Sequence, residues 1–152
     1  MMKPDEPNWK LYAVISGIYL KSRRLSEESL KSLGITFPQF GALLNLSARD
    51  NITQKELAER MDTDTTTIMV ICDSLEKKGL LERKKDPTDR RVNRLVLTAQ
   101  GRNVFGKSFP LMMERYKFFS EAAEQKEIEA VLPILEQLYS AIKTQYHKEL
   151  KK

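Results

Sequence analysis

The sequence predicts a mainly α-helical fold that carries a small β-hairpin. The chain has only six glycines and 8% aromatic residues, and its long segments rich in Leu, Glu, Lys and Ala favour helix over sheet. Residues 80–98 interrupt this pattern with two short runs of strand type around a tight turn. With 152 residues, of which 41% are apolar, the chain can bury one core of ordinary size. We therefore expect a single domain over residues 1–152.

The first helix is expected over about residues 8–33. Its apolar residues Leu11, Ile15 and Ile18 follow one another at intervals of three and four, which places them on one narrow face. Gly34 then ends the helix, because glycine readily adopts the left-handed conformation that follows a helix end.

Two capping boxes predict the next two helices. Thr36 and Gln39 stand three residues apart before an apolar run, and this pattern predicts a helix through about residue 47. Pro38 is compatible with that helix, because a proline in the first turn sacrifices no hydrogen bond within it. Thr53 and Glu56 repeat the spacing and predict a second, short helix.

A further helix is expected to follow the turn- and cap-forming segment 62–67 and to run to about residue 78. Helical spacing predicts a buried face made of Ile68, Ile71, Cys72 and Leu75. The opposite face carries Thr66, Met69, Val70 and Asp73. Gly79 is expected to end this helix, with Leu80 placed for the hydrophobic contact of a Schellman motif.

The hairpin that follows concentrates positive charge. We expect strands at residues 80–84 and 91–98, with Asp86 and Pro87 forming the turn. Residues 83–107 contain eight basic and two acidic residues, whereas the whole chain has a net charge of only +5. A local gathering of cations is the electrostatic footprint of a polyanion binder. An isolated basic loop would be read as a solvated surface, but the helix-turn-helix pattern before it favours DNA.

Long helices complete the chain after the hairpin. The helical pattern returns after Thr98, and Pro110 is expected to kink or break the helix. A last helix over about residues 124–150 repeats apolar residues at heptad spacing, with a bend expected at Pro133. The apolar stripes of this helix and of helix 8–33 can pack within one subunit or against a second one. We expect a homodimer, whose symmetry would set two reading helices about one DNA turn, roughly 34–36 Å, apart.

Four motifs occur in a characteristic order: TQKELAERM, LEKKGLLER, DPTDRR and LVLTAQG. In this combination the chain resembles the MarR family of winged helix-turn-helix regulators. The resemblance spans about residues 36–101 by motif, with a DNA-binding lobe at 36–98 and dimerisation helices at about 8–33 and 124–150. It implies a homodimer that binds a pseudo-palindromic operator in double-stranded DNA, usually as a repressor released by a small ligand or by oxidation.

The resemblance also assigns roles to the helix starts. Thr53 and Gln54 open the helix that crosses the DNA backbone, where they can hold a phosphate. Thr65, Thr66 and Thr67 begin the helix expected in the major groove, where hydroxyl groups can meet base edges. The alternative for each set is that it only caps its helix.

The recognition helix departs from the family pattern at one point. Many relatives carry a Thr-Arg pair where this chain has Met69 and Val70. These apolar side chains can contact thymine methyl groups in place of the missing hydrogen-bond donor.

In the hairpin, or wing, Asp89 and Arg91 match the family pair in which the carboxylate orients the guanidinium. Arg90 lies nearer the tip and is expected to enter a narrow minor groove, where negative potential is concentrated. Lys84 adds a further cation to the predicted DNA contacts.

The resemblance leaves the regulatory signal open. Redox-sensing relatives carry a cysteine in the N-terminal helix, whereas Cys72, the one cysteine here, is expected to be a buried core residue. A small aromatic or phenolic ligand is the alternative signal. Five residues are candidates to line its cleft, although ordinary core packing explains them better: Tyr12, Phe37, Phe40, Met112 and Tyr116.

Other functional classes find little support. His147 is the single histidine, and the sequence has no phosphate-binding loop, serine elbow or metal-ligand spacing, so we expect no catalytic residue, metal or cofactor. No apolar stretch approaches the length of a membrane span, and a cytoplasmic protein is expected. Two alternatives remain: a winged-helix DNA binder without ligand response or with an architectural role, and a winged-helix module for protein contacts.

Overall fold

The computed structural model describes residues 6–150, apart from the side chains of residues 147 and 150. Most of these residues are helical, as predicted. The elements in chain order are α1 (Pro7–Leu30), the 3₁₀ helix η1 (Lys31–Leu33), α2 (Phe37–Ala48), β1 (Ile52–Thr53), α3 (Gln54–Arg60), α4 (Thr65–Lys77), β2 (Leu81–Lys85), β3 (Asn93–Leu97), α5 (Ala99–Ala122) and α6 (Gln125–Leu150). The chain divides into two compact units, and the boundary between them lies within α5, between Arg115 and Tyr116.

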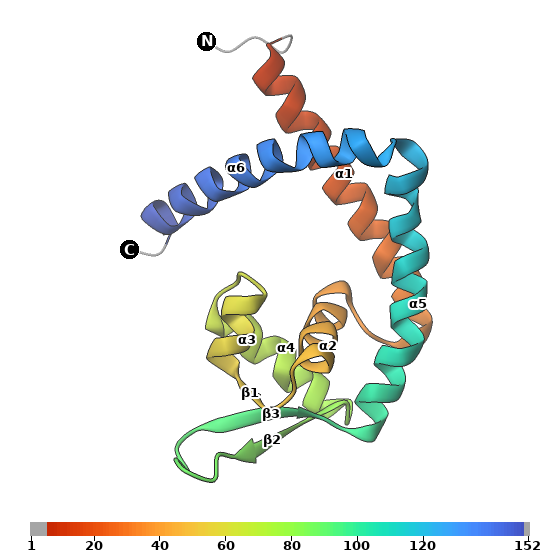
Figure 1. The fold of residues 1–152 in the computed structure, drawn as a ribbon. Coiled ribbons are helices and arrows are strands. Elements are labelled where there is room, and N and C mark those ends of the chain that lie inside the picture. The colour runs from red at the N-terminus through yellow and green to blue at the C-terminus, as the bar shows by residue number, and fades with distance from the viewer. Residues whose placement is uncertain (1–5, 151–152) are drawn as a thin grey trace. The chain divides into compact units, whose positions relative to one another are not determined.

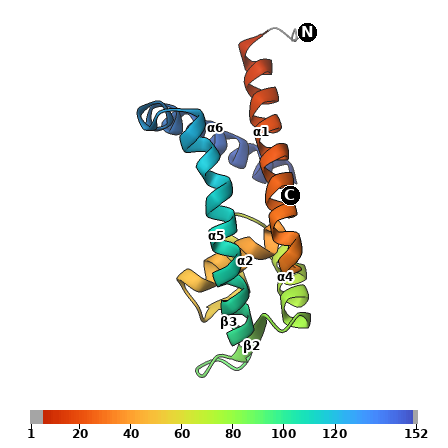
Figure 2. The same cartoon turned by 90° about the vertical axis from the view of Figure 1, so that its right-hand side faces the viewer.

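The first unit gathers α2, α3 and α4 on one side of a small sheet, from which the β2–β3 hairpin extends (Figure 1). The first part of α5 runs beside the end of α1 (Figure 2), where the Arg115 Nε donates a hydrogen bond of 2.7 Å to the Ser29 Oγ.

Both predicted capping boxes are confirmed. The Thr36 Oγ1 accepts the Gln39 N–H at 3.4 Å, and the Gln39 Oε1 accepts the Thr36 N–H at 3.0 Å. At the start of α3, the Thr53 Oγ1 accepts the Glu56 N–H at 3.1 Å, and the Glu56 Oε2 accepts the Thr53 N–H at 2.7 Å. Each box pairs backbone N–H groups that a helix start would otherwise leave unsatisfied.

The glycine stops are also confirmed. Gly34 and Gly79 have φ angles of 66° and 69°, in the left-handed region. After α4 the Gly79 N–H donates to the Glu76 carbonyl and the Leu80 N–H to the Leu75 carbonyl, both at 2.9 Å. This pair of bonds is the Schellman motif.

The prediction that Pro110 kinks or breaks its helix is wrong as to the break. Helix α5 continues through Pro110, and α6 contains Pro133 in its interior. Ser108 and Met112, on either side of Pro110, are both fully buried in the first unit. This packing holds α5 in place across the backbone hydrogen bond that the proline removes.

The sheet has three antiparallel strands in the order β1–β3–β2. Leu81 pairs with Leu97 in the hairpin, and Ile52 of β1 pairs with Leu95 on the other side of β3. The two hairpin strands lie within two residues of the predicted ends. The strand β1 was not expected, because a run of two residues carries no periodicity and its pairing partner is more than 40 residues away.

The core of the first unit lies between the helices and the inner face of the sheet. The predicted inner face of α4 is confirmed, since Ile68, Ile71, Cys72 and Leu75 are all buried. They belong to one cluster with the fully buried side chains of α2, α3 and β3, among them Leu43, Leu46, Leu57 and Leu95. Burial on this scale stabilises each large side chain by about 1.5–3 kcal/mol and fixes α4 to the sheet.

Candidate nucleic-acid interface

Helix α4 begins with a cap that leaves part of its first turn free. The Asp64 carboxylate accepts the Thr67 N–H at 2.8 Å and the Thr67 hydroxyl at 2.7 Å. These hydrogen bonds, that of the hydroxyl first, hold the pKa of Asp64 below its usual range. Thr67 therefore takes part in capping, whereas Thr65 and Thr66 are exposed on the outer side of the helix.

The same outer side carries two exposed apolar residues. Met69 and Val70 are 48% and 62% exposed. They follow Thr66 by three and four positions, so the three side chains share one helix face. The recognition helix thus presents hydroxyl and apolar groups where its first two turns meet solvent.

Further along α4, an arginine of the hairpin pairs with two carboxylates. The Arg83 Nη2 lies 2.6 Å from the Asp73 Oδ1, and its Nη1 pairs with Glu76. Burial of the Arg83 side chain opposes its charged form, but the hydrogen bonds that it donates to the two carboxylates, together with their negative charges, outweigh burial and raise the pKa of Arg83. Arg83 therefore fastens β2 to α4, so the orientation of the wing is tied to that of the recognition helix.

The exposed wing cations differ in how they are held. The Arg91 Nε and Nη2 each donate to Asp89 at 3.1 Å, in a bidentate pair that lowers the pKa of Asp89. The Lys84 Nζ lies 2.8 Å from a Glu82 carboxylate oxygen. Arg90 is exposed and makes no ion pair with any residue in the described part of the chain. Arg91 is thus oriented by Asp89, whereas Arg90 has no such carboxylate partner in the described part of the chain.

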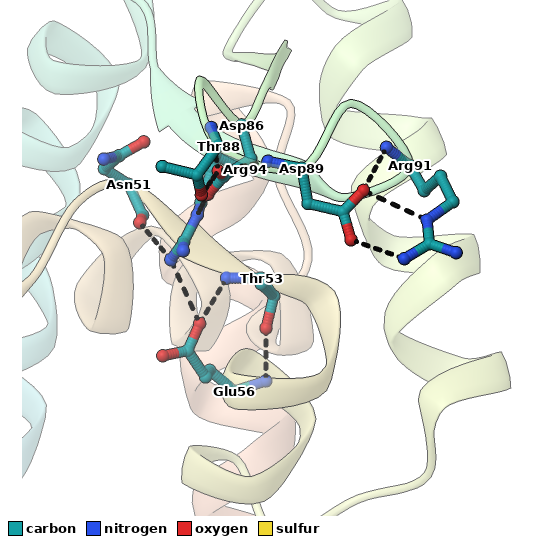
Figure 3. Close-up of polar contacts among 8 residues, drawn as sticks. All are labelled: Asn51, Thr53, Glu56, Asp86, Thr88, Asp89, Arg91 and Arg94. Carbon is teal, nitrogen blue, oxygen red and sulfur yellow. Dashed lines mark hydrogen bonds and ion pairs between the residues drawn. The ribbon is translucent and has the colours of Figure 1, made fainter.

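Asp86 organises the loop between the two strands (Figure 3). Its buried carboxylate accepts the Thr88 hydroxyl at 2.5 Å and the N–H groups of Thr88 and Asp89 at 2.7 and 3.1 Å. The Arg94 Nε donates to its second oxygen at 2.6 Å. The Thr88 hydroxyl first, and then Arg94, hold the pKa of Asp86 far below its usual range. The carboxylate is ionised at any physiological pH.

Arg94 carries this contact on to the start of α3 (Figure 3). Its Nη1 donates to the Asn51 carbonyl at 3.3 Å and lies 3.7 Å from the Glu56 Oε2. Glu56 is the residue that caps α3 with Thr53. The wing loop and the first helix of the helix-turn-helix are therefore joined through one guanidinium.

Sequence reasoning missed this network. It treated Asp86 as a turn residue and Arg94 as one cation of a basic run, because nothing local links two residues eight positions apart. The strand register holds the missing signal, since Lys84 pairs with Arg94 and the hairpin therefore brings Arg94 back beside the loop.

The structure also changes how the positive charge of residues 83–107 is interpreted. Arg83, Arg94 and Arg102 are all paired with carboxylates, and the acids that pair with Arg83 and Arg102 lie outside that segment. The cations left unpaired for a polyanion are fewer than the sequence count suggests. Among the described wing residues, Lys85 and Arg90 are exposed without a carboxylate partner, whereas Lys84 and Arg91 are exposed but paired.

The remaining predicted residues take the following places. Thr53 and Gln54 are half-buried at the start of α3. Cys72 is fully buried, and burial raises the pKa of its thiol to about 11. Among the candidate ligand-cleft residues, Phe40 and Met112 belong to the core and Tyr12 is 63% exposed.

Two searches of the described residues bear on other functions. No three acidic, histidine or cysteine side chains come together there as a metal site. None of the helices described is both long enough and apolar enough to cross a membrane.

Comparison with known proteins identifies the family. The sequence model of the MarR family matches residues 33–92. The chain is 31% identical over 108 residues to an HTH-type transcriptional regulator of Bacillus cereus, covering 70% of this chain and 71% of that protein. It is 32% identical over 87 residues to the organic hydroperoxide resistance transcriptional regulator of Bacillus subtilis, covering 55% of this chain. It spans only 59% of the length of that relative and 64% of another.

A solved structure agrees with this family assignment. The transcriptional repressor CouR, bound to a 23-mer DNA duplex, is 25% identical, with a TM-score of 0.79 over 91% of this chain and 99% of that one. The matched relatives are transcriptional regulators and not enzymes, as the sequence predicts. The chain belongs to the MarR family of winged helix-turn-helix transcriptional regulators.

Proposed function

We propose that the chain is a homodimeric repressor that binds a pseudo-palindromic operator in double-stranded DNA and is released by a small-molecule ligand. One observation carries the DNA-binding part: Arg83 and Arg94 tie the hairpin and its exposed cations to both helices of the helix-turn-helix. A reading helix and a wing that move as one body can dock together on adjacent grooves of one duplex.

The site residues take distinct roles in this proposal. Thr53 and Gln54 face the DNA backbone, and Thr65 and Thr66 enter the major groove while Thr67 fixes the start of α4. On the wing, Lys84 and Arg91 contact phosphates, with Arg91 aimed by Asp89, and Arg90 enters the minor groove.

The dimer is proposed from two apolar helix faces, each taken within its own unit. On α1, large apolar side chains such as Leu11, Ile15 and Ile18 are 40–47% exposed. On α6, Val131, Ile134 and Ile142 are 45–68% exposed. Exposed apolar faces of this length mark association surfaces, and contact with a second copy of the chain would bury both of them. Sedimentation equilibrium should give twice the chain mass at micromolar concentration. A monomer there would remove this part of the proposal.

A small aromatic or phenolic ligand is proposed as the signal. A ligand that binds better to a dimer with altered spacing releases DNA, because only one spacing of the reading heads fits successive grooves. Displacement of labelled operator by a panel of substituted phenols and benzoates tests this part. Failure of the whole panel to change the affinity favours a regulator without ligand response.

The DNA-binding part is tested by selecting from a random duplex pool over a salt series and sequencing the bound fraction. We expect an inverted repeat with half-sites about one helical turn apart and an affinity that falls steeply with salt. Salt-sensitive binding without enrichment would favour an architectural DNA binder. No binding at all would favour a module for protein contacts.

A further inference from the structure

We infer that helix α4 recognises pyrimidine C5-methyl groups in the major groove, through the exposed pair Met69 and Val70. The inference rests on the proposed DNA binding and specifies its chemistry. It assigns to this protein a preference for thymine over uracil at defined operator positions, and a tolerance for 5-methylcytosine in place of thymine at the same methyl contact.

The pair lies where a recognition helix meets bases. Val70 is 62% exposed and Met69 is 48% exposed, whereas Ile71, the next residue along the chain, lies on the buried face of the helix and is only 8% exposed. The apolar pair is therefore not an edge of the core. It occupies the outer face one turn after Thr66, within the part of α4 that is not covered by the hairpin clamp at Asp73 and Glu76.

The helix offers few groups for the alternative, hydrogen-bonded readout. Its sequence from residue 65 to residue 77 contains no Arg, Asn, Gln or His, the side chains that make bidentate or directed contacts to purine edges. Its one cation, Lys77, lies in the last turn. The hydroxyl groups of Thr65 and Thr66 can form hydrogen bonds with more than one kind of base, so they discriminate weakly between base pairs.

The two carboxylates of the helix share one arginine of the wing, which reduces their repulsion of DNA. Asp73 follows Val70 by three positions and would bring a negative charge to the same face. Arg83 pairs with both Asp73 and Glu76, so its charge offsets one of the two negative charges beyond the apolar pair. An apolar pair that follows hydroxyl groups, with the nearby acids held by Arg83, suits the C5-methyl group of thymine, the one apolar feature of the major-groove edge.

We assign DNA, and not a protein partner, to this face, because the wing fastened to the same helix is cationic. The wing that Arg83 fastens to α4 carries Lys84, Lys85 and Arg90 on its exposed side. An apolar protein-binding surface would have an uncharged or mixed rim. A patch of two side chains is also small for a stable protein interface, yet it matches the width of one or two base steps.

The test uses the duplex selected from the random pool, prepared once with thymine and once with uracil throughout. Uracil has the same hydrogen-bonding edges as thymine and lacks only the methyl group. The free energy gained by burying one methyl-sized group corresponds to a change in binding affinity of about fourfold for each methyl group contacted. We expect the uracil duplex to bind more weakly by at least that factor, with an unchanged salt slope.

Variants separate methyl contact from any effect of uracil on duplex shape. The variant M69A/V70A should bind thymine DNA more weakly and lose the difference between thymine and uracil, whereas M69L should keep it. K85A is the matched control, since it should lower affinity and salt slope but preserve the thymine preference. Because Met69 and Val70 are exposed, thermal unfolding should be nearly unchanged in these variants.

The outcomes are distinguishable from failure of the proposed function. Tight, sequence-specific binding that is equal for thymine and uracil duplexes would overturn methyl readout and leave the DNA-binding proposal intact. A uracil penalty of the same size in M69A/V70A would also overturn it, because shape would then explain the effect. Absence of binding to any duplex would overturn both.

Discussion

The glycine of the LVLTAQG motif, Gly101, lies where two backbone segments approach each other closely. The need for a glycine at this position can be tested directly. A Cβ at Gly101 would lie 2.0 Å from the Leu80 carbonyl oxygen and 2.9 Å from its carbon. That carbonyl accepts the Thr98 N–H at 3.3 Å, and the Gly101 N–H donates to the Thr98 Oγ1 at 2.9 Å. The Thr98 hydroxyl in turn donates to the Gly79 carbonyl at 2.6 Å. The end of α4, the hairpin and the start of α5 meet at this point.

The variant Gly101→Ala should therefore be destabilised, because the Leu80 carbonyl must move by roughly 1 Å or more to reach ordinary contact. Overpacking of this kind costs about 1–3 kcal/mol. At about 2–4 °C for each kcal/mol in a chain of this size, the midpoint of thermal unfolding should fall by about 2–12 °C.

Gly106→Ala provides the matched control in the same helix. No atom lies within 4 Å of a Cβ at that position, and alanine in a helix interior is more favourable than glycine by about 0.5–1 kcal/mol. Its unfolding midpoint should rise by about 1–4 °C. Circular dichroism at one fixed protein concentration measures both variants, since association would otherwise shift the midpoints. Equal midpoints for the two alanine variants would refute the close-approach argument.

Three further predictions concern the wing and the thiol. Arg90→Ala should reduce the slope of log affinity against log salt by about 0.9 for each phosphate that Arg90 neutralises, which is about 1.8 for the two copies in a dimer, and an unchanged slope in filter binding would exclude that contact. The native Cys72 thiol should resist Ellman's reagent at pH 8, because burial raises its pKa to about 11, whereas rapid labelling would contradict its burial. Asp86→Asn should flatten the loss of stability in acid. Hydrogen bonds from Thr88 and Arg94 hold the folded-state pKa of Asp86 below the value near 3.9 of an unfolded chain, so its contribution is complete above about pH 4 and is lost as the pH falls towards the folded-state pKa. Parallel acid profiles for both proteins in urea denaturation would contradict that role.

The parts of the fold predicted from sequence are those fixed by neighbouring residues. A capping box joins residues three apart, as at Thr53 and Glu56, and a Schellman motif needs only the glycine and the turn before it. The inner face of α4 follows from helical spacing alone. These signals depend on no tertiary information, so they placed the helix starts and stops within a few residues.

The parts that were missed depend on distant partners. Strand β1 exists because it pairs with β3, and Arg94 reaches Asp86 and Asn51 only once the hairpin and that pairing have formed. Arg83 was counted among the cations for a polyanion, whereas it binds two carboxylates of α4. Charge along the sequence cannot show which cations are neutralised within the fold, and this decides which ones DNA can meet.

The central claim is that two copies of the chain place two reading heads in successive grooves of one duplex. Hydroxyl-radical footprinting of the selected duplex, at a salt concentration where binding is half-maximal, measures this arrangement most directly. The account predicts two protected half-sites on the same face of the DNA, centred about one helical turn apart, that appear together as protein is added. A single protected half-site, or weak protection spread evenly along the duplex, would contradict it.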